Sequence, residues 1–301
     1  MFSKILVPLD GSPSAETSLA VVEALRAVFD STVTLIHLPE ADTPREAHGQ
    51  RHLAGGREAM DYLDEVAARA FPSGAKIERH VHEAEIADLS KSLADHAAEL
   101  CQDLVVLCVH GKGGLGRLFE GALGQRIMRY QTAPVLLLRA ETPPVLPFRR
   151  ILLALDGKPE HEQSFFLTRD FATATGAAVD LVSIVATRST LKGGQRAVGL
   201  LSPSAMRESL RLSEEKIDSY LGEKAGQLAE AGIDVNTIRR RGDPARQLSR
   251  LAREFGNDLI VLGTHGKAGS RAFWAESAAA RIIATTQLSA LLVPSEKASC
   301  G

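Results

Sequence analysis

Short apolar runs alternate along the chain with longer segments whose apolar residues recur about every 3.6 positions. Runs of strand length lie at residues 4–10, 32–38, 76–82 and 104–109, and a fifth lies at residues 134–138. The segments between these runs have the period of an amphipathic helix. This order predicts a parallel sheet covered by helices on both faces, because a helix is the usual connection between two parallel strands.

The same series is repeated after a proline-rich segment. Residues 258–294 repeat residues 103–139 in altered form, and a strand ending in aspartate again opens the copy. Residues 142–148 contain three prolines, which neither continue a helix nor suit a central strand. We therefore predict two α/β domains, at residues 1–141 and 149–297, joined by a semi-rigid linker.

The first and fourth strands of each copy end in groups that suit an anionic ligand. The first strand delivers Asp10 in one copy and Asp156 in the other, and the fourth leads into glycine-rich basic loops at residues 110–114 and 264–267. Ligands of parallel sheets bind beyond the carboxyl ends of the strands, where the winding reverses. Backbone N–H groups and a lysine can hold phosphates there, while the carboxylate accepts from a ribose or base. The alternative is that Asp10 caps the following helix and the glycines only make tight turns.

These strand ends resemble the universal stress protein family in its tandem two-domain form. Residues 7–12 look like the first-strand signature of that family, and both His-Gly-Lys loops look like its C-terminal signature. The resemblance covers nearly the whole chain. It implies Rossmann-like domains of the adenine nucleotide alpha hydrolase-like type, each with a five-stranded parallel sheet. It also implies a stress-linked cytoplasmic role and, as in some members, ATP bound between the first and fourth strands.

Both copies depart from the motif of the ATP-binding members, which is Gly-x-x-Gly, nine residues, and then Gly-Ser or Gly-Thr. In the first copy Cys108 replaces the first glycine and Ala122 lacks the final hydroxyl. In the second copy Glu276 brings a negative charge toward the phosphates. The first copy is the better candidate, because losing one hydroxyl costs less than adding one carboxylate.

The resemblance therefore implies ATP or another adenine nucleotide as the ligand, more readily in the first copy. The positions assigned to this ligand are Pro8, Asp10, Gly11, His110, Gly111, Lys112, Gly114, Gly121 and Ala122 in the first copy and Asp156, Gly263, His265, Gly266 and Ser277 in the second.

Histidines near the strand ends of the first copy form a second group of candidates. His80 and His82 share one face of a strand, a spacing that metal sites use, and His37 and His110 also lie near strand ends. Such a cluster could hold zinc and activate water. We favour the alternative, in which His37 and His110 are ordinary family residues and the other two are solvated, so no metal is assigned.

Composition narrows the class of function. The 35 basic and 37 acidic residues are mixed along the chain and give a net charge of -2, which argues against a nucleic-acid surface. The apolar runs are no longer than a strand and the chain begins without a signal-peptide pattern, so we expect no membrane segment and a cytoplasmic location.

The three cysteines lack Cys-x-x-Cys spacing and are expected to be reduced. The arginine run at residues 239–241 is expected to be a solvated strand end, with contact to an anionic ligand as the alternative.

The resemblance thus implies a cytoplasmic stress protein that responds to a small anionic ligand or a protein partner, without established catalysis. The alternative is an enzyme, either a slow ATP hydrolase or a metal-dependent hydrolase that uses the strand-end histidines and Asp10.

The apolar final strands, at residues 134–138 and 290–293, would be exposed sheet edges, so we expect them to pair in an intrachain pseudo-dimer. A homodimer is a further expectation. The insert at residues 187–206 follows a second strand and is placed to cover the second site.

Overall fold

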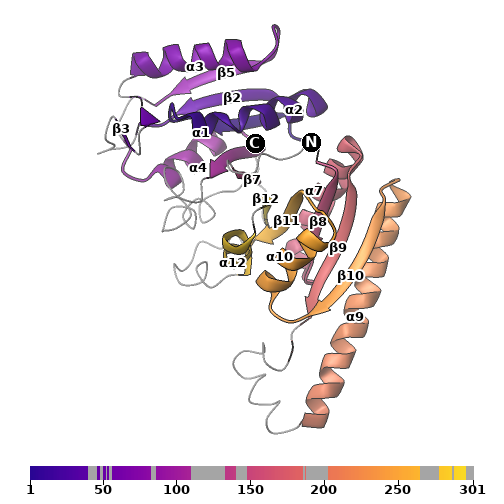
Figure 1. Ribbon diagram of the computed structural model, residues 1–301. Coiled ribbons are helices and arrows are strands. Elements are labelled where there is room, and N and C mark those ends of the chain that lie inside the picture. Colours follow the sequence, from indigo (N-terminus) through magenta and orange to yellow (C-terminus); the bar gives the residue numbers. More distant parts are fainter. Residues whose placement is uncertain are drawn as a thin grey trace.

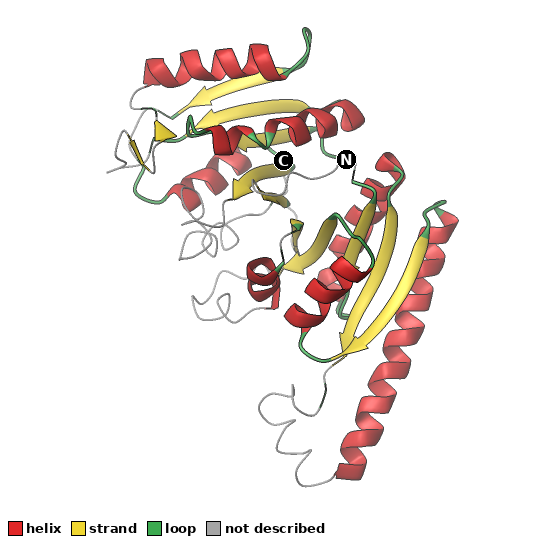
Figure 2. Ribbon diagram, viewed as in Figure 1, coloured by secondary structure: helices red, strands yellow, loops and turns green. Residues whose placement is uncertain are grey.

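The computed structural model describes residues 1–39, 46–47, 50–51, 53, 56–82, 86–109, 133–139, 148–185, 187, 203–264, 278–286 and 288–295. Within these residues the main feature is a ten-stranded sheet with helices on both faces (Figure 1, Figure 2). The strand order is β10-β9-β8-β11-β12-β7-β6-β1-β2-β5. The predicted α/β class is confirmed. Among the described residues, no helix combines the length and the apolar character needed to cross a bilayer.

The first half of the chain forms five strands that run parallel to one another. They are β1 (Lys4–Pro8), β2 (Thr32–His37), β5 (Ile77–Val81), β6 (Leu104–Val109) and β7 (Val135–Arg139). Its described helices are α1 (Pro13–Glu16), α2 (Leu19–Phe29), α3 (Gly56–Ala70) and α4 (Leu89–Glu99). A separate antiparallel pair is formed by β3 (Glu46–Ala47) and β4 (Gln50–Arg51).

The second half repeats this arrangement. Its parallel strands are β8 (Arg150–Ala154), β9 (Ala178–Val185), β10 (Val235–Arg241), β11 (Leu259–Thr264) and β12 (Ser289–Pro294). Its described helices are the 3₁₀ helix η2 (Pro159–His161), α7 (Glu162–Thr175), α9 (Pro203–Glu230), α10 (Pro244–Glu254) and α12 (Ala278–Thr285). Helix α9 begins inside the predicted insert, and residues 188–202 of that insert lie outside the described part of the chain.

The order of the strands places the reversal of winding where the sequence predicts it. In each half the first strand lies between the second and the fourth, as β1 lies between β2 and β6 and β8 lies between β9 and β11. Ile5 pairs with Leu104 in one half, and Ile151 pairs with Leu259 in the other. The carboxyl ends of β1 and β6, and of β8 and β11, are therefore the places where a crevice can form.

Two apolar cores stabilise the sheet, one on each face. Helices α2, α3, α7 and α9 pack on one face and α4, α10 and α12 on the other. The first core continues from one half into the other through a cluster of aromatic rings. Ring centroids of Phe2 and Phe171 lie 6.2 Å apart, and those of Phe29 and Phe171 lie 5.8 Å apart. Such contacts hold the two halves together by burial of aromatic surface.

The halves meet along their final strands, which pair antiparallel. Leu136 of β7 lies opposite Leu291 of β12, and both side chains are buried. Arg139 extends this junction, since its guanidinium donates to the carbonyl oxygens of Ile283 and Thr286 at the end of α12. The pairing satisfies backbone groups that would otherwise form two exposed edges. The predicted intrachain pseudo-dimer is confirmed, while the limits of the two domains at residues 141 and 149 stay a prediction.

Candidate functional site

The carboxyl ends of β1 and β8 carry the same turn. Gly11 and Gly157 follow the two aspartates with φ of +86° and +73°, a left-handed conformation that favours glycine. Asp10 Oδ1 accepts from the backbone N–H of Ser12 at 2.9 Å, and Asp156 Oδ1 accepts from that of Lys158 at 3.2 Å. Both carboxylates therefore shape the turn that leads into the next helix. The alternative to ligand binding had Asp10 as the cap of that helix, but the cap is Ser12, and Asp10 only stabilises the turn before it.

Helix α1 starts from Ser12, whose side chain accepts from the N–H of Ala15 at 3.2 Å, with Pro13 in the first turn. Asp10 is half-buried beside the N-terminus of this helix. Within the described residues, Asp10 accepts no hydrogen bond except that from Ser12 and forms no ion pair. An ionised carboxylate can accept about four hydrogen bonds, so the described residues use only a small part of the acceptor capacity of Asp10.

Asp156 is engaged more fully. His161 Nδ1 donates to its Oδ1 at 2.8 Å, and Lys158 Nζ lies 3.1 Å from its Oδ2. Burial alone would raise the pKa of Asp156, but the hydrogen bonds and charges of His161 and Lys158 outweigh it and lower this pKa to about 2. The carboxylate of the second half thus already has donors from its own chain.

His161 also covers the first glycine of the second motif. A Cβ placed on Gly263 would lie 3.0 Å from Cβ of His161 and 3.1 Å from two atoms of its ring. In the first half the corresponding position is Cys108, whose Sγ is buried 2.9 Å from Oγ1 of Thr17. Each half therefore fills the point of close approach with a side chain of its own. Sequence reasoning missed His161, although its position five residues after Asp156 was a usable signal.

Two cavities lie on either side of Asp156. One, of about 200 Å³, is mostly apolar and lies between the ends of β8, β9 and β11, with Gly263 and His161 in its wall. The other, of about 400 Å³, lies under α9 and is lined by polar groups of Ser183, Lys216 and Tyr220. A small molecule that reached both would have to pass the Asp156 carboxylate.

A larger cavity of about 600 Å³ lies at the junction of the halves, against Phe2, Gln102 and Phe166. It opens at the amino ends of β1 and β6, away from the strand ends that bind ligands in parallel sheets. We interpret it as a packing gap between domains. Cys101 lines it and is disulfide-bonded, so the prediction of reduced cysteines is wrong at this residue.

Several candidate residues lie outside the described part of the chain, so their assignment to a ligand stays a prediction. They are His110, Gly111, Lys112, Gly114, Gly121, Ala122, His265, Gly266 and Ser277.

The candidate histidines separate into two groups. His37 pairs in register with Val81 and therefore shares its face of the sheet, whereas His80 and His82 point to the opposite face. His37 Nδ1 donates to the carbonyl oxygen of Leu9 at 2.8 Å. His80 and His82 instead meet His96 of α4, which the sequence analysis did not include. Burial and the nearby His96 and His82 lower the pKa of His80.

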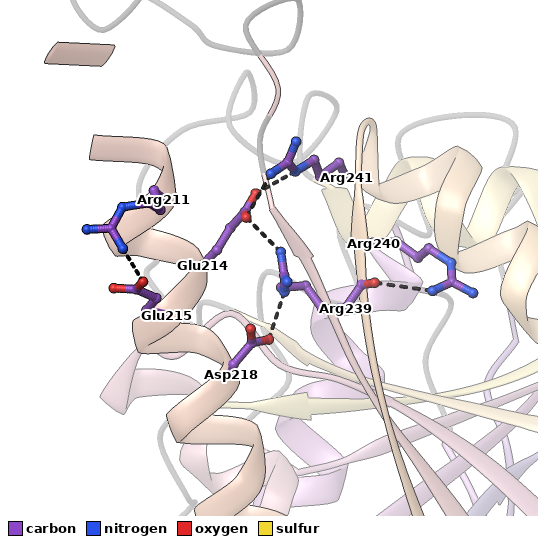
Figure 3. A network of polar contacts seen from close by, with 7 residues as sticks. All are labelled: Arg211, Glu214, Glu215, Asp218, Arg239, Arg240 and Arg241. Atoms are coloured by element: carbon purple, nitrogen blue, oxygen red, sulfur yellow. Dashed lines mark hydrogen bonds and ion pairs between the residues drawn. The ribbon is translucent and has the colours of Figure 1, made fainter. Parts of the chain in front are cut away.

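The arginines at the end of β10 bind acidic side chains of α9 (Figure 3). Arg239 lies 2.9 Å from Glu214 and 2.7 Å from Asp218, and Arg241 donates to Glu214 at 2.8 Å. Hydrogen bonds and charges from Arg241 and Arg239 lower the pKa of Glu214. Arg240 points away from this network. Since their charges are matched within the chain, these arginines give no support to an anion site.

Comparison with known proteins agrees with this architecture. The model of the universal stress protein family matches residues 1–139 and again residues 147–294. A universal stress protein of Mycolicibacterium smegmatis is 24% identical over 294 residues, which cover 92% of each chain. One from Synechocystis is 27% identical over 150 residues, covering 50% of this chain and 88% of its own.

Solved structures show the same fold. A universal stress protein from Archaeoglobus fulgidus superposes with a TM-score of 0.64 at 16% identity, covering 97% of this chain and 96% of its own. A putative universal stress protein from Pseudomonas aeruginosa gives 0.63 at 14% identity, covering 97% and 93%.

Proposed function

Because the chain belongs to the universal stress protein family and carries two of its domains in tandem, we propose that it is a cytoplasmic stress-response protein controlled by a small anionic ligand. The ligand proposed is ATP or another adenine nucleotide. It binds in the first half, beyond the carboxyl ends of β1 and β6, with Asp10 accepting from its ribose or base. The loop after β6 would supply the phosphate contacts.

The observation that carries this proposal is the difference between Asp10 and Asp156. Among the described residues, Asp10 accepts only from Ser12, whereas Asp156 is bound by both Lys158 and His161. A carboxylate with unused acceptor sites at a reversal of winding is suited to ribose hydroxyls or an adenine amino group. A carboxylate that already has three donors has only about one acceptor site left for a ligand.

The second half is expected to bind the same ligand more weakly. His161 would have to leave both Asp156 and Gly263 before a phosphate chain could approach that strand end. The two halves would therefore differ in role, with the first responding to the nucleotide and the second supporting the fold.

Titration calorimetry and thermal unfolding with Mg-ATP, ADP, adenosine and GTP test this proposal. We expect one high-affinity nucleotide per chain, and about 2.7 kcal/mol of stabilisation at a free concentration 100 times the Kd. Asp10→Ala should weaken binding by about 10- to 100-fold, since it removes a charged hydrogen-bond acceptor.

Asp156→Ala is the matched control, because it removes the equivalent carboxylate from the other half. It should leave the affinity within about twofold of wild type, a change near the precision of such measurements. No thermal shift at millimolar nucleotide would contradict the proposal. Loss of binding in Asp156→Ala, with Asp10→Ala unaffected, would move the site to the second half.

A further inference from the structure

Three histidines converge between β5 and α4, at the outer edge of the first half. His80 lies in β5, His82 is the first residue after the end of β5, and His96 lies in α4. One ring nitrogen of each lies within 4.8 Å of those of the other two. The ring centroids of His80 and His82 are each 5.0 Å from that of His96. No other group of three histidine, cysteine or acidic side chains within the described residues meets in this way.

The backbone fixes where these side chains point. His80 and His82 are two residues apart in extended chain, so both face α4. The strand end is held by the N–H of His82, which donates to the carbonyl oxygen of His37 at 3.1 Å. His96 lies on the inner face of α4, beside the buried Leu93, and is itself only 7% exposed. The rings are therefore presented by β5, by the residue directly after it and by α4.

The hydrogen bond of His96 leaves one ring nitrogen ready to bind a metal. Its Nδ1 lies 2.7 Å from the carbonyl oxygen of Ser92, and a carbonyl can only accept, so Nδ1 carries the proton. Nε2 then has its lone pair available. Histidines that bind metals are commonly oriented in this way, by donation from the other nitrogen to a carbonyl or carboxylate.

We propose that His80, His82 and His96 form a zinc-binding site with three imidazole ligands and a fourth position for water or another ligand. Zinc–nitrogen bonds of about 2.0–2.1 Å in a tetrahedral site place two nitrogens about 3.3 Å apart, so rotation of the partly exposed His80 and His82 rings completes the geometry. Imidazoles suit zinc, copper and nickel, whereas magnesium and calcium need oxygen ligands.

This site differs from the nucleotide site proposed above and does not depend on it. His80 and His82 lie on the α4 face of β5, while β2 separates this strand from β1 and Asp10. A bound ion would join the edge strand of the sheet to α4. We infer that zinc strengthens the packing of this edge, because a metal that binds only the folded chain stabilises it.

The site can be tested with the full chain after chelator treatment and removal of the chelator. Calorimetric titration with Zn²⁺ should give one ion per chain, and Co²⁺ should give the visible absorption of a tetrahedral nitrogen site. His80→Asn and His82→Asn should each weaken Zn²⁺ binding by at least about 10-fold, and both should abolish the Co²⁺ bands. Mg²⁺ should give neither signal.

His161→Asn is the matched control, because it removes a histidine of the second half, and it should bind Zn²⁺ like the wild type. Circular dichroism of the metal-free variants checks that each is folded, and His96→Leu fills the buried position without offering a ligand. The proposal is overturned if the wild type binds no stoichiometric Zn²⁺. It is also overturned if folded His80→Asn, His82→Asn and His96→Leu all keep wild-type affinity, or if His161→Asn loses binding to the same extent.

Discussion

The imidazole of His161 lies against Gly263, the residue that begins the second glycine motif. The Cβ of His161 is 3.0 Å from the place where a side chain on Gly263 would begin. The hydrogen bond from His161 to Asp156 keeps the ring there. A position that could admit a ligand close to the backbone is thus occupied by the protein itself.

Substitutions at this pair should show strong coupling. Gly263→Ala is expected to lower the free energy of unfolding by about 1 kcal/mol, because the new methyl group presses on a ring that Asp156 holds in place. In a His161→Ala background the same change should cost nothing or stabilise the strand, since alanine loses less backbone entropy than glycine. Urea unfolding of the wild type, the two single variants and the double variant gives the coupling free energy between the two positions. We expect it to be about 1 kcal/mol.

Gly222→Ala supplies a control for this cycle. A Cβ at that position in α9 meets no atom within 4 Å, so the change should stabilise the protein by about 0.5–1 kcal/mol. Equal cost of Gly263→Ala with and without His161 would show that the ring does not press on this position.

Asp156 should contribute to stability in a defined acid range. Its pKa in the folded protein is about 2, below its ordinary value of 3.8, so the unfolded chain takes up the proton first as the pH falls. The contribution is complete above pH 3.8 and is lost as the pH falls through about 2. The side chain is 42% exposed, and solvent screening should keep the effect below about 1 kcal/mol.

Urea unfolding between pH 5 and about pH 2 measures this effect in wild type and Asp156→Asn. The variant should lose less stability than the wild type over that range. Asp95→Asn, a change on the exposed surface of α4, controls for the loss of one carboxylate. If the free energy of unfolding falls by the same amount at low pH in the wild type and in Asp156→Asn, the prediction is contradicted.

Asp180 is the centre of a buried polar cluster in the second half. Its side chain is fully buried, and it accepts from Arg150 at 2.7 and 2.8 Å and from Asn257 at 2.8 Å. Asp180→Ala should lower the free energy of unfolding by about 3 kcal/mol, because it leaves a cation and two amides, those of Asn257 and Asn236, without this acceptor. In the first half Thr34 takes the equivalent position and accepts from Gln102 at 3.1 Å. Thr34→Ala should lower the free energy of unfolding by only about 1 kcal/mol.

Differential scanning calorimetry compares these two variants with the wild type. A drop in Tm that is several times larger for Asp180→Ala than for Thr34→Ala is expected. Similar drops for both would mean that the ion pair adds little beyond an ordinary hydrogen bond.

The ends of α2 and α7 offer a pair of opposite backbone changes. Asp30 and Gly176 both have left-handed backbones, with φ of 49° and 72°. Asp30→Gly should stabilise the protein by about 0.5–1 kcal/mol, and Gly176→Ala should destabilise it by about 1 kcal/mol. The ion pair of Asp30 with Lys76 is exposed, so its loss should matter little. Chemical denaturation measures the stability of both variants. If Asp30→Gly is less stable than the wild type, the ion pair with Lys76 contributes more than the relief of backbone strain at residue 30.

Much of the architecture could be predicted from local patterns in the sequence. Apolar period and turn residues are properties of a few neighbouring positions, so the strands of the main sheet, their order along the chain and the repeat were predictable, whereas the short pair β3 and β4 was not predicted. The Asp-Gly turns at Asp10 and Asp156 belong to this class, because a left-handed residue after the aspartate requires glycine. The exposed edges that two apolar final strands would leave also predicted their pairing.

The composition of the sites depended on contacts that no local pattern encodes. His96 joins His80 and His82 only because α4 packs on that face of the sheet, and the pleat turns His37 to the other face. His161 reaches Gly263 only because η2 packs against β11.

The sequence by itself therefore determined the elements, their order and the place of the crevice. Only the tertiary structure decided which side chains fill that crevice and which histidines meet, because these depend on how helices pack across strands far apart in the chain.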